Sequence, residues 1–533
     1  MAEKNKSIWF LGLILLWGVA VESQALHLLL PDFAVEDEMV ALQGYYGLVR
    51  MDFSGFAFYK YPGLLFLVLG LVLYPAYLLY NLKTLVHLQT VSDLKYFLGH
   101  PSLPEPSAIY LGRVESLAFG LVAVWFFFML FRKRLGERAS LWGALFLVSS
   151  PGWLFSCSLL KNDSLLLLSL MLLVYACYEV LERGRSKDYL LSGVGLGLCL
   201  ALKFHIFALA PLLFAHWLRN STARRTGKII SRELGMSLGL ALLIFFIFSP
   251  AYFLHPARAF EAMLLEMAIQ SRALPLFRAG RWWWHWPVLF QLFCVFPLAM
   301  GIFGYLTSLF GASQVKNYLA GKNLSLFFSY PAVFFAGWAV ISRLGYPHLY
   351  LPLLPFLAAL AGMAIDRLLS GKWYLKLTAA TLVSASMLYN MVCFKELNRA
   401  QSSIVTNSLE ALSPLGAAGK IPAFFPYRPL AGSRYHLDFE FLPQFLLTEK
   451  WLEKNHPLRV LVHQTYYLSY LNHPEMNSAD RAGFEILRTG ESGWRREKEW
   501  EVELKWGRIY ACLFPDLKNF SVGLFCSTSS AGP

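Results

Sequence analysis

The sequence predicts a polytopic α-helical membrane protein, and three observations support that class. The chain of 533 residues is 56% hydrophobic and only 15% charged, against roughly 25% charged residues in soluble domains. Apolar stretches of about 18 or more residues recur along it, which is the length that a helix needs to cross a bilayer. These stretches lack the polar and apolar alternation of barrel strands. We therefore expect helical spans, about 11–13 in number.

The net charge of +13 is concentrated in short basic clusters between the apolar stretches. In a soluble protein such a charge would suggest nucleic acid, but these clusters follow helix ends, as the positive-inside rule describes. We therefore expect anionic membrane lipids as partners, no nucleic acid, and a multi-pass location in the plasma (inner) membrane. The clusters expected in the cytoplasm are residues 1–6, 132–138, 182–187, 219–228, 314–322 and 366–372.

These clusters fix the direction of each predicted helix, because successive spans must cross in opposite directions. A first helix at about 8–28 runs outward, and we favour its retention although the N-terminus resembles a signal peptide. Residues 189–218 have basic flanks at both ends, so we expect a hairpin of two short helices with its apex near Lys203 and His205. The other predicted spans are about 108–131, 139–158, 164–181, 232–252, 287–310, 324–342, 350–365 and 375–394.

Residues 62–82 are apolar enough to span the membrane, but a single crossing there breaks the alternation of directions. Both the acids before this segment and the helix entered at about residue 108 are expected outside. We expect a re-entrant or paired hairpin over 62–107, with a helix along the membrane surface as the alternative. The stretch "SDLKYFLGHPSLPEP" predicts a surface helix followed by a proline-rich turn.

The composition changes near residue 395. Residues 1–395 form the predicted transmembrane catalytic domain, with a first extracytoplasmic loop at about 29–107. Residues 396–533 carry many charges and alternating runs such as "LRVLVHQTYYL", which predict a small α/β extracytoplasmic domain. Cys512 and Cys526 lie in this domain, and they would close a short loop if it faces an oxidising compartment.

Ionisable residues from separate parts of the chain gather at the predicted extracytoplasmic ends of the helices. Such residues are costly in an apolar matrix, so their convergence predicts a functional site. Single members have simpler explanations: Lys60 and Arg113 could reach lipid headgroups, Asp163 could cap the next helix, and loop acids could serve solubility. The residues that map to this end are Asp37, Glu38, Lys60, Arg113, Asn162, Asp163, Lys203, His205, Arg272, Arg278, Arg281, His285, Arg343, Tyr346 and His348.

Carboxylates and basic groups on one face suit a group-transfer reaction. A carboxylate of Asp37 or Glu38 could act as a general base on a hydroxyl or amine, while nearby lysines and arginines could bind a leaving phosphate. Gly193 and Gly197 follow no strand, so they predict helix packing rather than a nucleotide-binding loop. Any phosphate would therefore arrive on a lipid. We expect no cofactor and no metal ligands, although the sequence leaves a divalent metal open.

A set of motifs, in order over about residues 8–365, resembles the C-type glycosyltransferases of the protein O-mannosyltransferase and lipid A aminoarabinose transferase group. The chain departs from the family pattern at Gly63, where a second proline is usual, and upstream of Asp163, where an arginine is usual. The motifs are "EDEMVALQGYY" with "FYKYPGLL", then "YLGRVESLAFG", "SCSLLKNDSLLLL", "GLCLALKFHIFALAPLL" and "RLGYPHLYLPLLPFLAALAG".

The resemblance implies a C-type glycosyltransferase fold and an inverting transfer from a polyprenyl-phosphate sugar donor to a lipid, glycan or protein acceptor. It implies Asp37 as the catalytic base with Glu38 in support. A polytopic transporter or lipid flippase is the alternative, although no internal repeat is evident, and a scaffold role of the C-terminal domain is a third. We expect the donor phosphate to contact Lys60, Arg113, Lys203 and His205, and the site to be lined by Asp163, Arg281, Tyr346 and His348.

Overall fold

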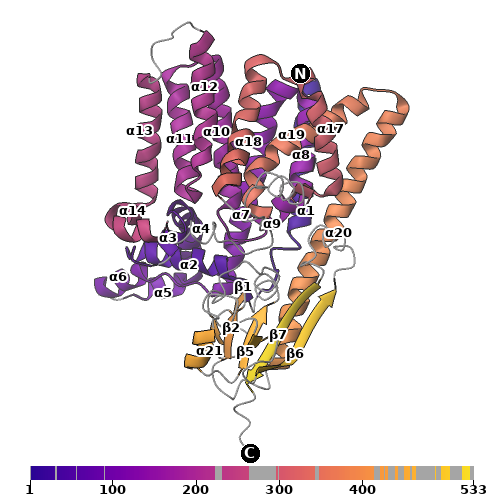
Figure 1. The fold of residues 1–533 in the computed structure, drawn as a ribbon. Helices are drawn as coiled ribbons and strands as arrows, with labels where there is room; N and C mark the ends of the chain where they lie inside the picture. Colours follow the sequence, from indigo (N-terminus) through magenta and orange to yellow (C-terminus); the bar gives the residue numbers. More distant parts are fainter. Residues whose placement is uncertain are drawn as a thin grey trace, which may run out of the picture.

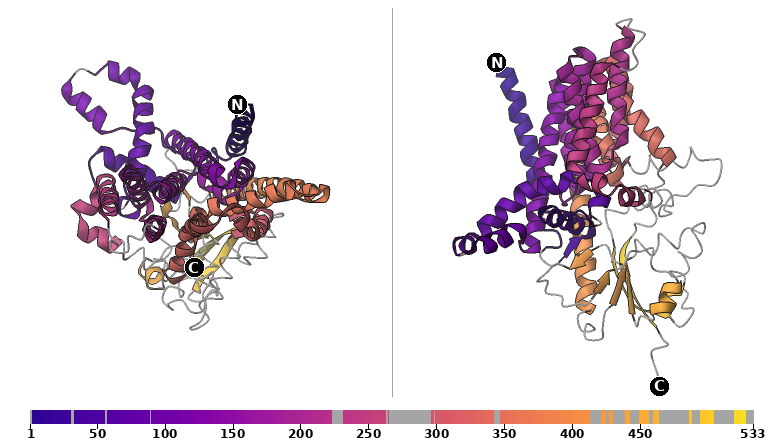
Figure 2. Two further views of the ribbon diagram at one scale, coloured as in Figure 1. Left: turned by 90° about the horizontal axis from the view of Figure 1, so that it is seen from above. Right: turned by 90° about the vertical axis from the view of Figure 1, so that its left-hand side faces the viewer.

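The computed structural model shows a bundle of long helices with a small mixed domain at one end (Figure 1). The helices of the bundle run up and down beside one another, and the N-terminus lies at the end opposite the small domain (Figure 1, Figure 2). The structure describes residues 2–30, 33–55, 57–88, 90–222, 231–262, 264, 296–297, 299–341, 347–412, 421–424, 427–429, 439–441, 449–455, 459–463, 486–487, 494–503 and 519–527.

The bundle is held together by apolar side chains between its helices, with Trp153 and Phe131 among the fully buried ones. Most helices begin and end within a few residues of the predicted spans. They are α1 (Ala2–Glu22), α7 (Glu105–Leu135), α8 (Glu137–Ser149), α9 (Pro151–Cys157), α10 (Asp163–Glu182), α11 (Ser186–Lys203), α12 (Leu209–Thr222), α13 (Arg232–Phe248), α14 (Pro250–Leu254), α17 (Ile302–Tyr318), α18 (Gly321–Ile341), α19 (Leu354–Leu369) and α20 (Trp373–Leu412), with the short helices η1 (Ile206–Ala208) and η2 (Pro347–Leu353).

In the described part of the chain, four helical stretches are long and apolar enough to cross a membrane on their own. They are α7, α10, Tyr350–Leu369 and Trp373–Asn407. The pair α8 and α9, bent by 59°, makes a fifth if it is one broken span. The other bundle helices are shorter or less apolar, so the total of about 11–13 spans stays a prediction.

The ends of the helices carry their charges as the sequence predicts. Arg134 at the end of α7 forms an ion pair of 2.6 Å with Glu182 at the end of α10. The Ser7 hydroxyl donates to the Glu137 carboxylate over 2.6 Å, so the start of α1 lies beside the start of α8. The described residues of the basic clusters at 1–6, 132–138 and 182–187 therefore lie at the end of the bundle that holds the N-terminus (Figure 1). Which side of the membrane this end faces stays a prediction.

Helix α11 lies between α10 and α13 at close range, because three glycines remove the side chains that would separate them. A Cβ at Gly193 would lie 2.5 Å from the carbonyl oxygen of Ser237 in α13. A Cβ at Gly195 would lie 2.8 Å from the Cα atom of Leu173 in α10, and Gly197 faces α13. Small residues allow such backbone contact between membrane helices. The prediction that Gly193 and Gly197 pack helices is confirmed.

The segment 62–107 folds back on itself and projects from the side of the bundle (Figure 2), and whether it enters the membrane or lies along its surface stays a prediction. The Tyr77 hydroxyl of its first long helix donates to the Phe97 carbonyl of its last helix over 2.9 Å. The first of these helices has 17 residues, which is short for a span. The helices of the first loop are α2 (Glu36–Val49), α3 (Ala57–Lys60), α4 (Leu64–Tyr80), α5 (Leu82–Val86) and α6 (Val91–Gly99).

The C-terminal part contains a five-stranded mixed sheet, in line with the predicted α/β domain. The strand order is β4-β2-β5-β7-β6; β2 is parallel to β4 and β5, while β7 is antiparallel to β5 and β6. Helix α20 runs unbroken past the predicted boundary at 395 and contacts β6 and β7. Cys526 lies on β7, and Cys512 lies outside the described residues. The remaining elements are β1 (Phe33–Val35), β2 (Ile421–Phe424), β3 (Tyr427–Pro429), β4 (Phe439–Phe441), α21 (Glu449–Asn455), β5 (Arg459–His463), β6 (Trp494–Glu503) and β7 (Asn519–Ser527).

Candidate active site

The predicted acids begin helix α2, directly after strand β1. Asp37 and Glu38 both lie in the first turn of α2, where the positive end of the helix dipole favours carboxylates. The Glu38 carboxylate accepts a hydrogen bond of 3.0 Å from the N–H of Val35, the residue that precedes the helix. A glutamate at the third helical position commonly makes this capping contact. The helix start thus fixes where both acids lie.

Strand β1 connects these acids to the C-terminal domain. It pairs antiparallel with β3, with Ala34 opposite Arg428 and Phe33 opposite Pro429. Pro429 has no N–H, and the Val35 N–H already bonds to Glu38. Because bonded and non-bonded pairs alternate in an antiparallel ladder, Ala34 and Arg428 make the bonded pair. The sequence offered no sign of this contact, because a three-residue strand has no periodicity to read.

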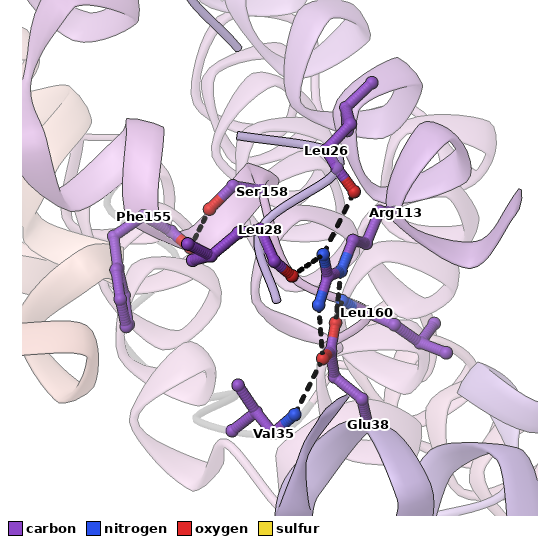
Figure 3. Close-up of polar contacts among 8 residues, drawn as sticks. All are labelled: Leu26, Leu28, Val35, Glu38, Arg113, Phe155, Ser158 and Leu160. Carbon is purple, nitrogen blue, oxygen red and sulfur yellow. Dashed lines mark hydrogen bonds and ion pairs between the residues drawn. The ribbon is translucent and has the colours of Figure 1, made fainter. Parts of the chain in front are cut away.

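Glu38 and Arg113 form an ion pair that is completely buried (Figure 3). The Arg113 Nε and one terminal nitrogen each donate to a different Glu38 oxygen over 2.8 Å. The other terminal nitrogen donates to the carbonyls of Leu26 (3.0 Å) and Leu28 (2.7 Å). The same Glu38 carboxylate accepts the Leu160 N–H over 2.9 Å. One pair therefore ties together the residues after α1, the start of α2, α7 and the loop before α10.

These contacts limit the part that the Glu38 and Arg113 side chains can take in a reaction. The Glu38 carboxylate accepts four hydrogen bonds from the protein, and Arg113 donates four. Planar bidentate pairing of this kind gives a fixed geometry. The arrangement favours a positioning role for the pair over direct chemistry, and the expected contact of Arg113 with a donor phosphate stays a prediction.

Asp37, the neighbour of Glu38 in sequence, meets a different cation. Its carboxylate oxygen Oδ2 lies 2.8 Å from Lys161 Nζ, and the two side chains are 29% and 12% exposed. Lys161 lies in the connection between α9 and α10. Burial lowers the pKa of the Lys161 ammonium, but the carboxylates of Asp37 and Asp163 outweigh it and the pKa is raised. Lys161 is not among the site residues predicted from the sequence; the available signal is a lysine between two apolar runs, two residues before Asp163.

Asp163 is the first residue of α10 and forms an ion pair with Lys203 at the end of α11. The Asp163 side chain is 3% exposed and that of Lys203 is 22% exposed. Asn162 occupies the N-cap position, but its side chain makes no capping bond. Its amide donates instead to the Leu202 carbonyl over 2.6 Å. The start of α10 thus holds the end of α11, with an ion pair and a hydrogen bond.

Four of these side chains form an alternating series of charges, which we call the charge row: Asp37, Lys161, Asp163 and Lys203. Ion pairs join the first two and the last two. Asp163 raises the pKa of Lys161, so its carboxylate also lies near the middle of the row. The row is most exposed at Asp37 and Lys203 and most buried between them. The row thus presents the Asp37 carboxylate and the Lys203 ammonium group to a ligand at this end of the bundle.

His205 lies two residues beyond Lys203, but it contacts other groups. The Phe204 backbone adopts the left-handed region at φ +50°, which ends α11. Beyond this turn the His205 ring forms a hydrogen bond with the Tyr330 hydroxyl of α18. It also packs on Phe334, with ring centroids 5.6 Å apart. His205 therefore joins the hairpin apex to α18, and its expected contact with the donor stays a prediction.

Close packing between two helix ends explains why residue 63 is a glycine. A Cβ at this position would lie 2.3 Å from the carbonyl oxygen of Phe248, the last residue of α13. Any side chain at residue 63 would therefore force the turn after α13 away from the start of α4. This contact offers a physical account of the departure from the family pattern, because the larger proline ring would occupy the same space.

Some predicted site residues fall where the structure gives no side-chain placement. Lys60 ends α3 and His348 lies in η2, and the side chains of both are outside the described residues. Among the described residues, no group of three or more His, Cys, Asp or Glu side chains could hold a metal ion. The expectation of no metal ligands stays a prediction. The predicted residues that lie wholly outside the described ranges are Arg272, Arg278, Arg281, His285, Arg343 and Tyr346.

Residues 109–258 match the family model described as dolichyl-phosphate-mannose-protein mannosyltransferase. Several solved structures are similar at low identity, among them the following three. ArnT from Cupriavidus metallidurans bound to undecaprenyl phosphate is 14% identical, with 98% of each chain covered and a TM-score of 0.47. The S. cerevisiae Pmt1-Pmt2 complex bound to the sugar donor is 17% identical, over 48% of this chain and 34% of that one, with a TM-score of 0.33. AglB from Archaeoglobus fulgidus is 12% identical, over 96% and 81%, with a TM-score of 0.49.

No curated protein matches the chain. The family match confirms the resemblance that the motifs indicated, and it includes Arg113, the charge-row residues Lys161, Asp163 and Lys203, and the glycines of α11. Together with the helical bundle, it supports a membrane glycosyltransferase of the C type as the class of protein. The transporter or flippase alternative is not favoured.

Proposed function

We propose that the protein moves a sugar from a polyprenyl-phosphate-linked donor to a lipid, glycan or protein acceptor on the extracytoplasmic face of the plasma (inner) membrane. The observation that carries this proposal is the charge row. It places a partly exposed carboxylate, Asp37, 2.8 Å from the mostly buried ammonium group of Lys161, and it holds a second ammonium group, Lys203, on Asp163. A base and phosphate-binding cations are what transfer from a phosphate-linked sugar requires.

In the proposed reaction, Asp37 accepts the proton of the acceptor hydroxyl or amine. The acceptor atom then attacks the anomeric carbon from the face opposite the phosphate. A new glycosidic bond forms, the bond from the anomeric carbon to the phosphate oxygen breaks, and that oxygen leaves with the electron pair. Lys203 and Lys60 would stabilise the charge that develops on the leaving lipid phosphate. Attack from the opposite face inverts the configuration of the sugar.

The position of the charge row supports the proposed orientation. Asp37 and Asp163 lie at the starts of their helices, and Lys203 lies at the end of its helix. This end of the bundle is the one opposite the N-terminus and the basic clusters (Figure 1). Under the positive-inside rule the basic end is cytoplasmic, so the charge row and the C-terminal domain would be extracytoplasmic. A transporter, in contrast, would place its charges near the middle of the membrane.

Replacing Asp37 by asparagine tests the function directly. Purified variant and wild type are given dolichyl-phosphate-linked mannose or undecaprenyl-phosphate-linked aminoarabinose, with cell-envelope extract as the acceptor source. We expect Asp37→Asn to lower sugar transfer by at least about 100-fold, since general base catalysis contributes roughly 10²–10⁴. The matched control is Asp52→Asn, because Asp52 is exposed and bonds only locally to Ser54 among the described contacts.

Elution of both variants as monodisperse protein in detergent shows that they remain folded. Full transfer by Asp37→Asn would reject the proposed base. The transporter alternative would be favoured instead if the labelled lipid moves across the membrane of proteoliposomes and neither donor gives a glycosidic product.

A further inference from the structure

Lys161 is held at the charge row by a rigid frame. Two neighbouring residues of one loop meet two neighbouring acids of α2. The Leu160 N–H donates to the Glu38 carboxylate over 2.9 Å, and Lys161 Nζ lies 2.8 Å from Asp37 Oδ2. Because Glu38 is itself held by Arg113 in the buried pair, the backbone beside Lys161 is fixed relative to α2. The loop therefore delivers the ammonium group to Asp37 at a set position.

The ammonium group is charged at neutral pH although it is mostly buried. The carboxylate of Asp37 lies 2.8 Å from it, and together with that of Asp163 it raises the pKa of Lys161 against the effect of burial. An opposite charge at this range typically shifts the titration of a carboxylate down by about 1–3 pH units. Without the cation, Asp37 would lose the ion pair that favours its charged form. Removing the charge should therefore let Asp37 take up a proton at higher pH.

We propose that Lys161 is a positioning residue of the transfer reaction: its ammonium group holds Asp37 ionised and oriented, and so sets the lowest pH at which the base works. This inference rests on the proposed role of Asp37. It is the charge of residue 161, rather than its length, that the reaction needs. Among the described side chains, the other charged groups of this region are Glu38 with its partner Arg113 and Asp163 with its partner Lys203.

An infrared pH titration reads this effect without any donor. The carboxyl band of Asp37 is assigned as the one that Asp37→Asn removes from the full-length protein in detergent. We expect Lys161→Met, which has a similar volume and no charge, to move the midpoint of this band up by about one pH unit or more. Lys161→Arg keeps the charge and should leave the midpoint within a few tenths of a unit. An unchanged midpoint in Lys161→Met would overturn the inference.

The pH profile of transfer gives the second measurement, with the donor that supports transfer in the wild type. In Lys161→Met, the pH at which kcat/KM falls on the acid side should move up by the same amount as the infrared midpoint. Transfer should recover at high pH. An equal loss of transfer at every pH would show that Lys161 has only a structural role. A raised KM for the donor with an unchanged pH profile would show that Lys161 contacts the donor phosphate. Either result overturns the inference. Full transfer by Asp37→Asn would reject the proposed base and with it the role of Lys161 in transfer, whereas an unmoved infrared midpoint in Lys161→Met would reject the inference and leave the proposed base untouched.

Discussion

Replacing Glu38 by glutamine should destabilise the protein strongly, although the two side chains have nearly the same shape. The glutamine amide is neutral and carries N–H donors on one side. It would face the Arg113 guanidinium and the N–H groups of Val35 and Leu160, all of which are donors. The substitution thus leaves Arg113 as a buried charge without its counterion. Both side chains of the pair are fully buried, so water is not in place to replace the carboxylate beside Arg113.

The size of the effect follows from the burial of the pair. Removing one partner of a buried ion pair typically costs about 3–5 kcal/mol, because the remaining charge is uncompensated. Replacing both partners costs less than the sum of the single losses, since no charge is then left unpaired. We therefore expect Glu38→Gln and Arg113→Met each to lose about 3–5 kcal/mol. The double variant should lie much closer to either single variant than to their sum.

The free energy of unfolding can be followed by tryptophan fluorescence during SDS titration in mixed micelles, using the 16 tryptophans of the chain. Arg496→Gln is the control, because Arg496 and Glu499 form an ion pair whose side chains are 54% and 42% exposed. Exposed pairs are worth about 0–1 kcal/mol, so this control should change little. If Glu38→Gln loses no more free energy of unfolding than Arg496→Gln, the buried pair does not stabilise the fold by the expected amount.

Two further substitutions test how the site is held in place. Gly63→Ala should lower transfer by tenfold or more, measured as donor turnover, because its Cβ would lie 2.3 Å from the Phe248 carbonyl; Gly55→Ala, with nothing within 4 Å of the added Cβ, should behave as wild type. Arg428→Pro should lower turnover, because it removes one N–H of the bonded pair with Ala34. Arg428→Ala keeps that N–H and should leave turnover unchanged. Equal turnover by the two variants would show that the pairing of β1 with β3 does not position the acids.

The course of the helices was predictable because it depends on hydropathy and charge over many residues. Helix α7 was expected at about 108–131 and is Glu105–Leu135. The hairpin of α11 and α12 follows from basic flanks at both ends, and its apex lies at Lys203 and His205 as expected. Both inferences use the average of a long stretch, so a single residue does not alter them. The same averaging explains why helix ends differ from the predicted ones by several residues.

The pairing of charges at the site was not predictable in the same way. The sequence placed Arg113 and Lys203 at one end of the bundle, and the structure agrees with that placement. Which carboxylate each one meets depends on the rotation of α2 about its axis and on the path of the loop before α10. Neither is encoded in a local pattern, and Lys161 was overlooked because a single lysine between two apolar runs resembles many others. Long-range partners of this kind need the packed structure.

The two neighbouring acids of α2 can be given different tasks on geometric grounds. Successive residues of a helix point about 100° apart, so Asp37 and Glu38 cannot both face one cation. Glu38 turns inward to Arg113 and is fully buried, while Asp37 turns to Lys161 and keeps part of its surface exposed. A buried acid that accepts four hydrogen bonds cannot reach an acceptor substrate without unfolding its surroundings. The exposed acid can, and its inward neighbour holds the loop that carries Lys161. Loss of Glu38 should therefore appear first as loss of stability, and loss of Asp37 as loss of transfer in a stable protein.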